Sequence, residues 1–324
     1  MNPTKVCAKV PASTANLGPG FDSLGMALNL YSWIEMDVAE KTVIHLHGGE
    51  MQGIPTDKSN LIYKVAQDVF RRAGVSYPEL EISMHSEIPL TRGLGSSASA
   101  IVGAMAAANA LIGSPLSDDE LFQMAAAMEK HPDNVGASLF GGLIVSYWDG
   151  ERAEYIRIEP EESLEIMVAI PRFQLATEKA RNVLPKELSM GDAVFNIGHS
   201  SLLVAAFATG RYDMIAKAMK DAVHQPYRAA LIPGMERILG EATDHGALGA
   251  ALSGAGPTVL ALVDSKAGKQ QELESFLLEA FRSAQVEADI RLLKPCRSGV
   301  QCWNVTPGNR TLIESIQGET VQNP

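Results

Sequence analysis

The segment Pro89-Leu-Thr-Arg-Gly-Leu-Gly-Ser-Ser-Ala-Ser-Ala100 decides the fold of this chain. Its two glycines allow positive φ angles and a close approach of the backbone to a ligand. Its serines lie where an alanine-rich helix is expected to begin, over residues 97–111. The first turn of a helix offers free N–H groups and the positive end of the helix dipole, which together hold phosphate. The segment therefore predicts an anion-binding loop.

Two other nucleotide-binding patterns compete for this segment. The Walker A loop ends in Gly-Lys-Ser/Thr, and the segment contains no lysine. The dinucleotide pattern Gly-x-Gly-x-x-Ala is matched at Gly93, Gly95 and Ala98, but it expects a strand ending in an acidic residue about 20 residues later. A second helix is expected there instead, because Ser117 and Glu120 have the spacing of a capping box. A helix cap of small residues without a ligand stays the structural alternative.

The composition is that of a globular protein without a nucleic-acid partner. The chain has 324 residues, enough for one large domain or two ordinary ones, and its net charge of −11 argues against a nucleic-acid surface. Cys7, Cys296 and Cys302 are too few and too far apart for a disulfide framework or a zinc site, which indicates reduced thiols. The start of the chain lacks an apolar signal segment, and the most apolar helix candidate, residues 98–112, is too short to span a bilayer. We therefore expect a cytoplasmic protein with no membrane partner.

Strand and helix patterns alternate irregularly along the chain. Residues 13–25 form a polar, glycine-rich stretch that we expect to be a loop between two strands, a place where ligands commonly bind. The remaining pattern predicts strands over 5–10, 27–38, 43–47, 80–85, 142–148, 164–170, 248–252, 258–263 and 286–292, and helices over 60–73, 97–111, 117–128, 189–208, 211–220, 231–242 and 272–283. Such a mixture without strict βαβ alternation favours an α+β fold. The charged residues 149–164 indicate a boundary between domains 1–160 and 161–300, with a tail over 301–324.

The loop and several distant segments resemble the GHMP kinases, a superfamily that includes galactokinase, mevalonate kinase and homoserine kinase. Pro89-x-x-x-Gly-Leu-Gly-Ser-Ser-Ala is similar to the family's phosphate loop, and Leu252-Ser-Gly-Ala-Gly-Pro-Thr258 resembles its third motif. Val10-Pro-Ala-Ser-Thr-Ala-Asn-Leu-Gly-Pro-Gly-Phe-Asp-Ser-Leu-Gly25 resembles the first motif in the version found in homoserine kinases. Residues 129–134 (EKHPDN), 176–181 (ATEKAR) and 226–228 (PYR) also occur in family order, so the resemblance covers most of the chain.

The resemblance implies a two-domain GHMP kinase fold, in which a domain of the ribosomal S5 domain 2-like type precedes a ferredoxin-like domain. It implies ATP and Mg²⁺, with L-homoserine as the small-molecule substrate and O-phospho-L-homoserine, an intermediate of threonine biosynthesis, as the product. Members of the family are often homodimers. The ATP phosphates are expected against residues Pro89, Leu90, Thr91, Arg92, Gly93, Leu94, Gly95, Ser96, Ser97, Ala98 and Ser99.

The resemblance also implies positions for a metal ion and for the catalytic groups. Mg²⁺ prefers oxygen ligands, and Ser97 and Glu129 are implied as its ligands, although a solvated carboxylate at a helix end is the alternative for Glu129. Asp133, together with Asn134 and Arg181, is implied as the catalytic group. An alcohol is a poor acid and the transition state is loose, so we expect Asp133 to position the hydroxyl rather than to remove its proton fully.

Homoserine is a zwitterion, so both of its charges need partners. Arginine binds a carboxylate through two parallel hydrogen bonds, which makes Arg181 and Arg228 the candidates for the α-carboxylate. The candidates for the ammonium group are the oxygen acceptors Asn16, Asp22 and Asp133. Further substrate-site candidates are His131, Thr177 and Gly254, of which His131 also suits a structural role before a proline and Gly254 a tight turn.

Two other functions stay open at this point. A different GHMP kinase substrate, such as a polyol or a mevalonate-like acid, is compatible with paired arginines. A regulatory protein that binds a nucleotide without turnover is the other interpretation, and the presence of Ser97, Glu129 and Asp133 speaks against it. Dependence on the α-amino group of the substrate separates homoserine from other acids, and turnover separates an enzyme from a regulatory protein.

Overall fold

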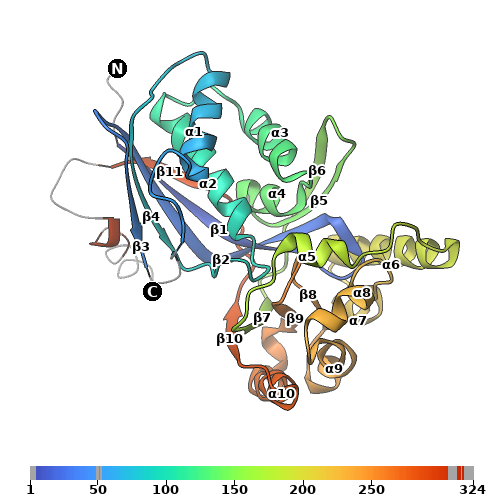
Figure 1. Ribbon diagram of the computed structural model, residues 1–324. Coiled ribbons are helices and arrows are strands. Elements are labelled where there is room, and N and C mark those ends of the chain that lie inside the picture. Colours follow the sequence, from blue (N-terminus) through green and yellow to red (C-terminus); the bar gives the residue numbers. More distant parts are fainter. Residues whose placement is uncertain (1–4, 49–50, 52, 306–311, 315, 317–324) are drawn as a thin grey trace.

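The structure is a computed structural model that describes residues 5–48, 51, 53–305, 312–314 and 316. The chain forms two domains, each built on one β-sheet with helices packed against it (Figure 1). The α+β class expected from the sequence is confirmed. Within the described ranges, no helix combines the length and the apolar character needed to cross a membrane.

A seven-stranded sheet forms the first domain. Its main path follows the order β11-β1-β2-β4-β3, and β5 pairs with both β2 and β6. The strands are β1 Val6–Asn16, β2 Gly20–Val38, β3 Val43–His47, β4 Leu80–Ser86, β5 Leu143–Trp148, β6 Ala153–Ile158 and β11 Gln301–Asn304. β3 and β4 are parallel, whereas the other pairs are antiparallel. β2 is long enough to pair with β5 near its start and with β4 near its end, so it reaches the junction with the second domain.

Four helices cover one face of the first sheet (Figure 1). They are α1 Leu61–Arg72, α2 Ser96–Leu111, α3 Asp118–Glu129 and α4 Asp133–Phe140. α2 is buried on nearly all sides, because its many alanines allow strands and neighbouring helices to approach closely. α3 begins with the capping box expected from the sequence, in which Ser117 and Glu120 exchange hydrogen bonds. This packing fixes the first turn of α2, and with it the loop that precedes α2.

The second domain contains a four-stranded antiparallel sheet in the order β10-β7-β9-β8. The strands are β7 Leu164–Pro171, β8 Gly249–Leu252, β9 Val259–Asp264 and β10 Ala288–Leu293. Because β9 is antiparallel to both of its neighbours, β7 and β8 run in the same direction on either side of it. This split βαβ unit and the strand order are those of a ferredoxin-like domain.

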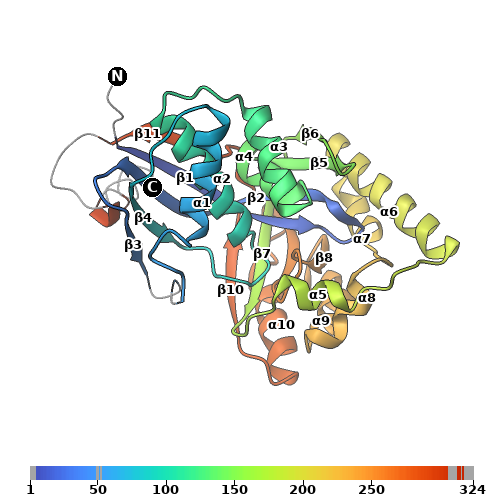
Figure 2. The same ribbon diagram turned by 45° about the horizontal axis from the view of Figure 1, so that its top comes forward.

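Helices and the first domain bury both faces of the second sheet. The helices are α5 Thr177–Asn182, α6 Met190–Thr209, α7 Ile215–Ala218, α8 Gln225–Arg228, α9 Met235–Glu241 and α10 Gln270–Ser283. β7 is buried along its whole length, as expected for a strand that is covered on both sides. Ile166 and Val168 belong to a core cluster with residues of β2 and α6, whereas Met167 and Ala169 belong to one with residues of α9 and α10. α6 extends along the edge of the domain in both views (Figures 1 and 2).

The expectation of a loop over residues 13–25 is wrong. β1 and β2 continue through this stretch, and only residues 17–19 turn the chain between them. The small polar side chains of the stretch are tolerated inside a buried strand because they find partners there. Ser13 Oγ donates to Asn134 Oδ1 over 2.9 Å, and Thr14 Oγ1 lies 2.8 Å from Ser253 Oγ.

Other expected elements differ in their limits. The expected helix over 211–220 is reduced to α7 and a short 3₁₀ turn, and α4, α5 and α8 are short helices that the periodicity does not predict. Residues 301–304, which the sequence pattern placed in a tail, form β11 and pair with β1. The remainder of that tail lies largely outside the described residues. The domain boundary at residue 160 stays a prediction, and in the structure this position falls between β6 and β7.

Candidate functional site

A cavity of about 130 Å³ lies where the two domains meet. The first domain contributes the end of β1, the start of β2, the loop before α2 and the connection between α3 and α4. The second domain contributes α5, α8 and the turn between β8 and β9. Among the predicted site residues, those that line the cavity are Asn16, Asp22, Thr91, Gly93, Gly95, Ser96, Ser97, Ala98, Glu129, His131, Asp133, Asn134, Thr177, Arg181, Arg228 and Gly254.

The loop before α2 presents backbone N–H groups to this cavity. Gly95 is the N-cap of α2 in the left-handed conformation, with φ of 71°, and it has no side chain that could occupy the N–H groups of the first turn. Ser97, in this first turn, donates through Oγ to Glu129 Oε1 over 2.6 Å. Leu94 and Ser99 are buried beneath the loop and do not line the cavity, nor do Pro89, Leu90 and Arg92. The start of α2 therefore has the uncapped first turn on which the expected anion binding rests, and the binding itself stays a prediction.

Glycine is required where the loop meets the rest of the site. Gly93 has φ of 80°, and a Cβ atom on it would overlap the backbone carbonyl oxygen of Ser253 in the second domain. A Cβ atom on Gly95 would overlap the hydroxyl of Ser13 in β1. Both glycines therefore allow backbone contacts that no other residue permits.

The turn between β8 and β9, residues 253–256, forms hydrogen bonds with two parts of the first domain, the loop before α2 and the end of β1. Ser253 Oγ donates to the carbonyl oxygen of Gly93 over 2.5 Å, and the N–H of Gly254 donates to the carbonyl oxygen of Ala15 over 3.1 Å. The carbonyl oxygen of Gly254 accepts hydrogen bonds from Asn16 Nδ2 at 2.9 Å and from Arg228 Nη1 at 3.0 Å. The turn thus joins the phosphate-loop side of the cavity to its charged side.

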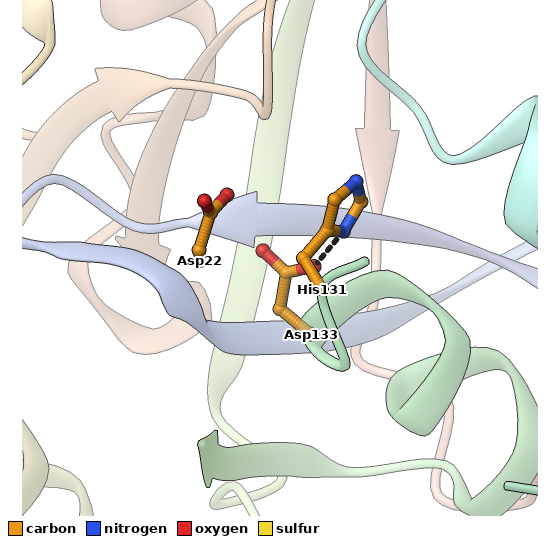
Figure 3. Close-up of side chains that lie close together, drawn as sticks. All are labelled: Asp22, His131 and Asp133. Carbon is orange, nitrogen blue, oxygen red and sulfur yellow. Dashed lines mark hydrogen bonds and ion pairs between the residues drawn. The ribbon is translucent and has the colours of Figure 1, made fainter. Parts of the chain in front are cut away.

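Asp22, His131 and Asp133 gather at one end of the cavity, and one ligand atom of each lies within 4.8 Å of the others (Figure 3). Asp133 is 1% exposed and begins α4. Its Oδ1 accepts hydrogen bonds from His131 Nδ1 at 2.8 Å and from the N–H of Asn134 at 2.7 Å. Both hydrogen bonds go to Oδ1 of Asp133, and Oδ2 takes part in neither of them.

His131 carries a positive charge at neutral pH. Burial disfavours the charged imidazolium, but the hydrogen bond and the attraction to Asp133, with smaller contributions from Asp22 and Glu129, outweigh burial and raise the pKa of His131 to about 8. Its Nε2 lies 3.6 Å from Glu129 Oε2. The positively charged ring of His131 therefore lies between the carboxylates of Asp133 and Glu129.

The two arginines occupy different environments. Arg181 pairs with Asp22 through two hydrogen bonds, of 3.0 Å from Nη1 and 2.8 Å from Nη2, and this pair is partly exposed. Arg228 is 1% exposed. Burial and the nearby charge of Arg181 lower the pKa of Arg228 to about 10, so it stays protonated at neutral pH. Arg181 and Asp22, each expected to meet a charge of the substrate, thus meet each other in this structure.

The backbone around the turn between β1 and β2 is unusual, from the end of β1 to Asp22 in β2. Asn16, Leu17 and Asp22 have positive φ angles of 71°, 48° and 55°, which side-chain-bearing residues rarely adopt. Such conformations cluster at functional sites, where the surrounding structure enforces them. Here the hydrogen bond from the N–H of Asp22 to Asn16 Oδ1, over 3.0 Å, closes the turn.

Phe21 is the main site residue that sequence reasoning missed. It lines the cavity, and its ring centroid lies 5.5 Å from Arg181 Cζ and 5.3 Å from Arg228 Cζ. Its position next to Asp22 in the first motif was the available signal, but in this expected loop only polar and charged groups were considered, and an aromatic ring was passed over. The cavity is also lined by Ala15, Leu175, Ala255 and Gly256, whose side chains carry no chemistry that would have selected them.

Comparisons with family models and with curated relatives both point to the GHMP kinases. The model for the N-terminal domain of GHMP kinases matches residues 60–142, and the model for the C-terminal domain of GHMP kinases matches residues 203–282. A homoserine kinase of Carboxydothermus hydrogenoformans is 42% identical over 91% of this chain and 95% of its own length. A homoserine kinase of Moorella thermoacetica is 43% identical over 90% of this chain and 97% of its own length.

A solved structure has the same fold. The crystal structure of homoserine kinase from Cytophaga hutchinsonii superimposes with a TM-score of 0.83 at 26% sequence identity. The match covers 93% of this chain and 98% of that chain, so it extends over both domains.

We predict that Gly93→Ala weakens ATP binding by about 10-fold or more, because the new methyl group displaces the loop from Ser253. Isothermal titration calorimetry of the wild type and the variant measures this change. The matched control is Gly268→Ala, since Gly268 also has a positive φ, of 67°, but has no atom within 4 Å of the position that a Cβ atom would take. Equal ATP affinity in both variants would show that the contact with Ser253 does not shape the loop.

Proposed function

The chain belongs to the GHMP kinase family, and we propose that it transfers the γ-phosphoryl group of ATP to the side-chain hydroxyl of L-homoserine. The product is O-phospho-L-homoserine, an intermediate of threonine biosynthesis. The observation that carries this proposal is the arrangement of one cavity, which has a phosphate loop on one wall and both arginines and carboxylates on the others. The arginines and carboxylates match the two opposite charges of a zwitterionic acceptor.

The loop before α2 supports binding of the ATP phosphates. The uncapped N–H groups in the first turn of α2 face the cavity, and the helix dipole adds a positive potential at the same place. Ser96 and Ser97 lie in this turn and offer hydroxyl groups to phosphate oxygens. Phosphoryl transfer depends mainly on positioning and charge stabilisation, which this wall provides without a lysine.

Ser97 and Glu129 fit a Mg²⁺ ion by their chemistry. Their oxygen atoms are 2.6 Å apart at the start of α2, and a hydroxyl with a carboxylate is the kind of oxygen donor set that Mg²⁺ accepts together with phosphate oxygens and water. When bound, the ion neutralises negative charge on the phosphate groups. Glu129 also lies near the imidazolium of His131, so it is held on two sides before any ligand enters.

The charged residues support recognition of an amino acid. Asp22 and Arg181 form an ion pair that presents one negative and one positive group, the same two charges that homoserine carries. The α-carboxylate is expected to bind Arg181 and Arg228, and the ammonium group to bind Asp22 and Asn16 Oδ1. Thr177 begins α5, one helical turn before Arg181, and adds a hydroxyl to the same wall.

Asp133 supports positioning of the acceptor hydroxyl. It is buried at the cavity, and His131 and the N–H of Asn134 fix its Oδ1. Oδ2 then accepts a hydrogen bond from the acceptor hydroxyl. This bond directs a lone pair of the hydroxyl oxygen toward the phosphorus atom. The ring of His131 lies 2.8 Å from Asp133 and helps to hold this carboxylate in place, and a loose transition state requires little further help from a base. The cytoplasmic location and the homodimer expected from the sequence stay predictions.

An ATP-dependent assay tests the proposed function. We expect turnover of L-homoserine, measured by coupled release of ADP, and much slower turnover of mevalonate, galactose and shikimate. A des-amino analogue, 4-hydroxybutanoate, is expected to react poorly, because it offers no ammonium group to Asp22. Turnover of one of the other alcohols without turnover of homoserine would overturn the substrate assignment.

Arg228→Ala is expected to raise the KM for homoserine by roughly 10- to 100-fold, because it removes a charge-assisted contact with the carboxylate. The KM for ATP should change by less than about threefold. Steady-state kinetics with each substrate varied in turn measure both values. Arg172→Ala is the matched control, since Arg172 is 60% exposed and pairs only with Glu287 and Asp289 in the hydrogen bonds and ion pairs described. An equal rise of both KM values in Arg228→Ala would contradict a specific role in carboxylate binding.

Glu129→Gln is expected to raise the Mg²⁺ concentration required for half-maximal rate by about 10-fold or more, because an amide oxygen binds Mg²⁺ more weakly than a carboxylate does. Titration of activity with MgCl₂ at a fixed, saturating ATP concentration measures this value. Glu151→Gln, a substitution of an exposed carboxylate in the same domain, serves as the control. An unchanged Mg²⁺ requirement in Glu129→Gln would remove Glu129 from the ligand set.

A further inference from the structure

His224 is a fully buried histidine next to the cavity, and it does not line it. Its Nε2 lies 2.8 Å from the carbonyl oxygen of Gly18, and its Nδ1 lies 3.1 Å from Arg228 Nη1. A carbonyl oxygen only accepts and a guanidinium only donates. The two neighbours therefore select one neutral tautomer, in which Nε2 carries the hydrogen and Nδ1 accepts from Arg228.

The surroundings keep this imidazole neutral. Burial lowers the pKa of His224 to about 4; the attraction of Asp221 opposes this shift and the positive charge of Arg228 reinforces it. At neutral pH the lone pair of Nδ1 is consequently available to Arg228. Protonation would place an N–H group against the guanidinium and break the contact.

Arg228 is held at defined points. Its Nε donates to the carbonyl oxygen of Ala180 over 3.0 Å, and its Nη1 donates to His224 and to the carbonyl oxygen of Gly254. These three hydrogen bonds use the hydrogen of Nε and both hydrogens of Nη1. The hydrogens of Nη2 are left for a ligand in the cavity that Arg228 lines.

Other contacts fix His224 itself. Asp221 accepts hydrogen bonds from the backbone N–H groups of Val223, His224 and Gln225, at 3.0, 3.1 and 2.7 Å, and so determines how α8 begins. The ring of Phe21 stacks on the imidazole with a centroid distance of 5.2 Å. Phe21 and Gly18 belong to the first domain, so the position of His224 depends on both domains.

We propose that His224 is a positioning residue, which fixes the orientation of the Arg228 guanidinium through Nδ1 and thereby sets the affinity for the carboxylate of the substrate, without touching the substrate. The proposal rests on the proposed function, because it assumes that Arg228 binds the α-carboxylate. It also gives the carbonyl oxygen of Gly18 a role, since this group selects the tautomer that Arg228 needs. The two domains must be in contact for the carboxylate site to be complete.

The test compares two amide substitutions at one position. The amide of His224→Asn can place an acceptor where Nδ1 lies, whereas the longer amide of His224→Gln replaces Nε2 and loses the acceptor for Arg228. We expect the KM for homoserine to rise about 10-fold or more in His224→Gln and less than about threefold in His224→Asn, with the KM for ATP nearly unchanged in both. Equal homoserine KM values in the two variants and the wild type would overturn the proposal.

A substrate without the carboxylate separates positioning from a general structural effect. The wild type and His224→Gln should have kcat/KM values for 3-amino-1-propanol within about twofold of each other, because this amino alcohol makes no use of the carboxylate site. A loss as large as that seen with homoserine would show that His224 supports the whole cavity, and it would refute a role through Arg228. If His224→Gln does not fold, judged by circular dichroism, His224→Phe keeps the stacking on Phe21 and is expected to behave in the same way.

A double-mutant cycle completes the test. In the Arg228→Ala background, His224→Gln should leave kcat/KM for homoserine unchanged within about twofold, since the group it positions is gone. A further loss of the original size would mean that His224 acts independently of Arg228, against the proposal. Failure of the proposed function itself appears differently, because the wild type then shows no turnover of homoserine at all.

Discussion

The backbone contact between Gly93 and the turn at 253–256 is the constraint on which the site depends. It brings the loop before α2, which belongs to the first domain, against a hairpin turn of the second domain, with the Ser253 hydroxyl bonded to the Gly93 carbonyl oxygen. The hydrogen bonds of Gly254 then extend the same contact to β1 and to Arg228. The loop for phosphate and the residues for an amino acid face one cavity because this turn joins them. The two sheets and their helices serve to hold these backbones at that separation.

Charge balance is the second property of the cavity. Asp22, Asp133 and Glu129 supply negative charge, and Arg181, Arg228 and the imidazolium of His131 supply positive charge at close range. A site with balanced charges costs less to bury than a site with a single sign. It also suits an acceptor that is neutral overall but carries both charges. The phosphate groups are expected to rely instead on backbone N–H groups, which carry no net charge.

The sequence predicted what depends on local patterns. The glycine and serine spacing of the loop, the capping box at Ser117 and the apolar run of β7 are decided by neighbouring residues, and they indicated the right elements. The polar strand around Ser13 was misjudged because its partners, Asn134 and Ser253, are more than a hundred residues away. His224 and Phe21 were missed for the same reason, since their roles come from a contact between domains. Family resemblance located Arg181 and Asp22, but no pattern indicated that they pair with each other.

The strand β11 has a consequence for the order in which the chain matures. It covers the outer edge of β1 at residues Val6–Lys9, although it is made about 300 residues later. During synthesis this edge lacks its native partner while residues 161–304 are translated, which takes roughly 7 to 30 seconds at ordinary rates of chain elongation. An open strand edge is a template for pairing with other chains. The domain that is synthesised first is thus the one completed last, and one edge of its sheet stays unpaired throughout that interval.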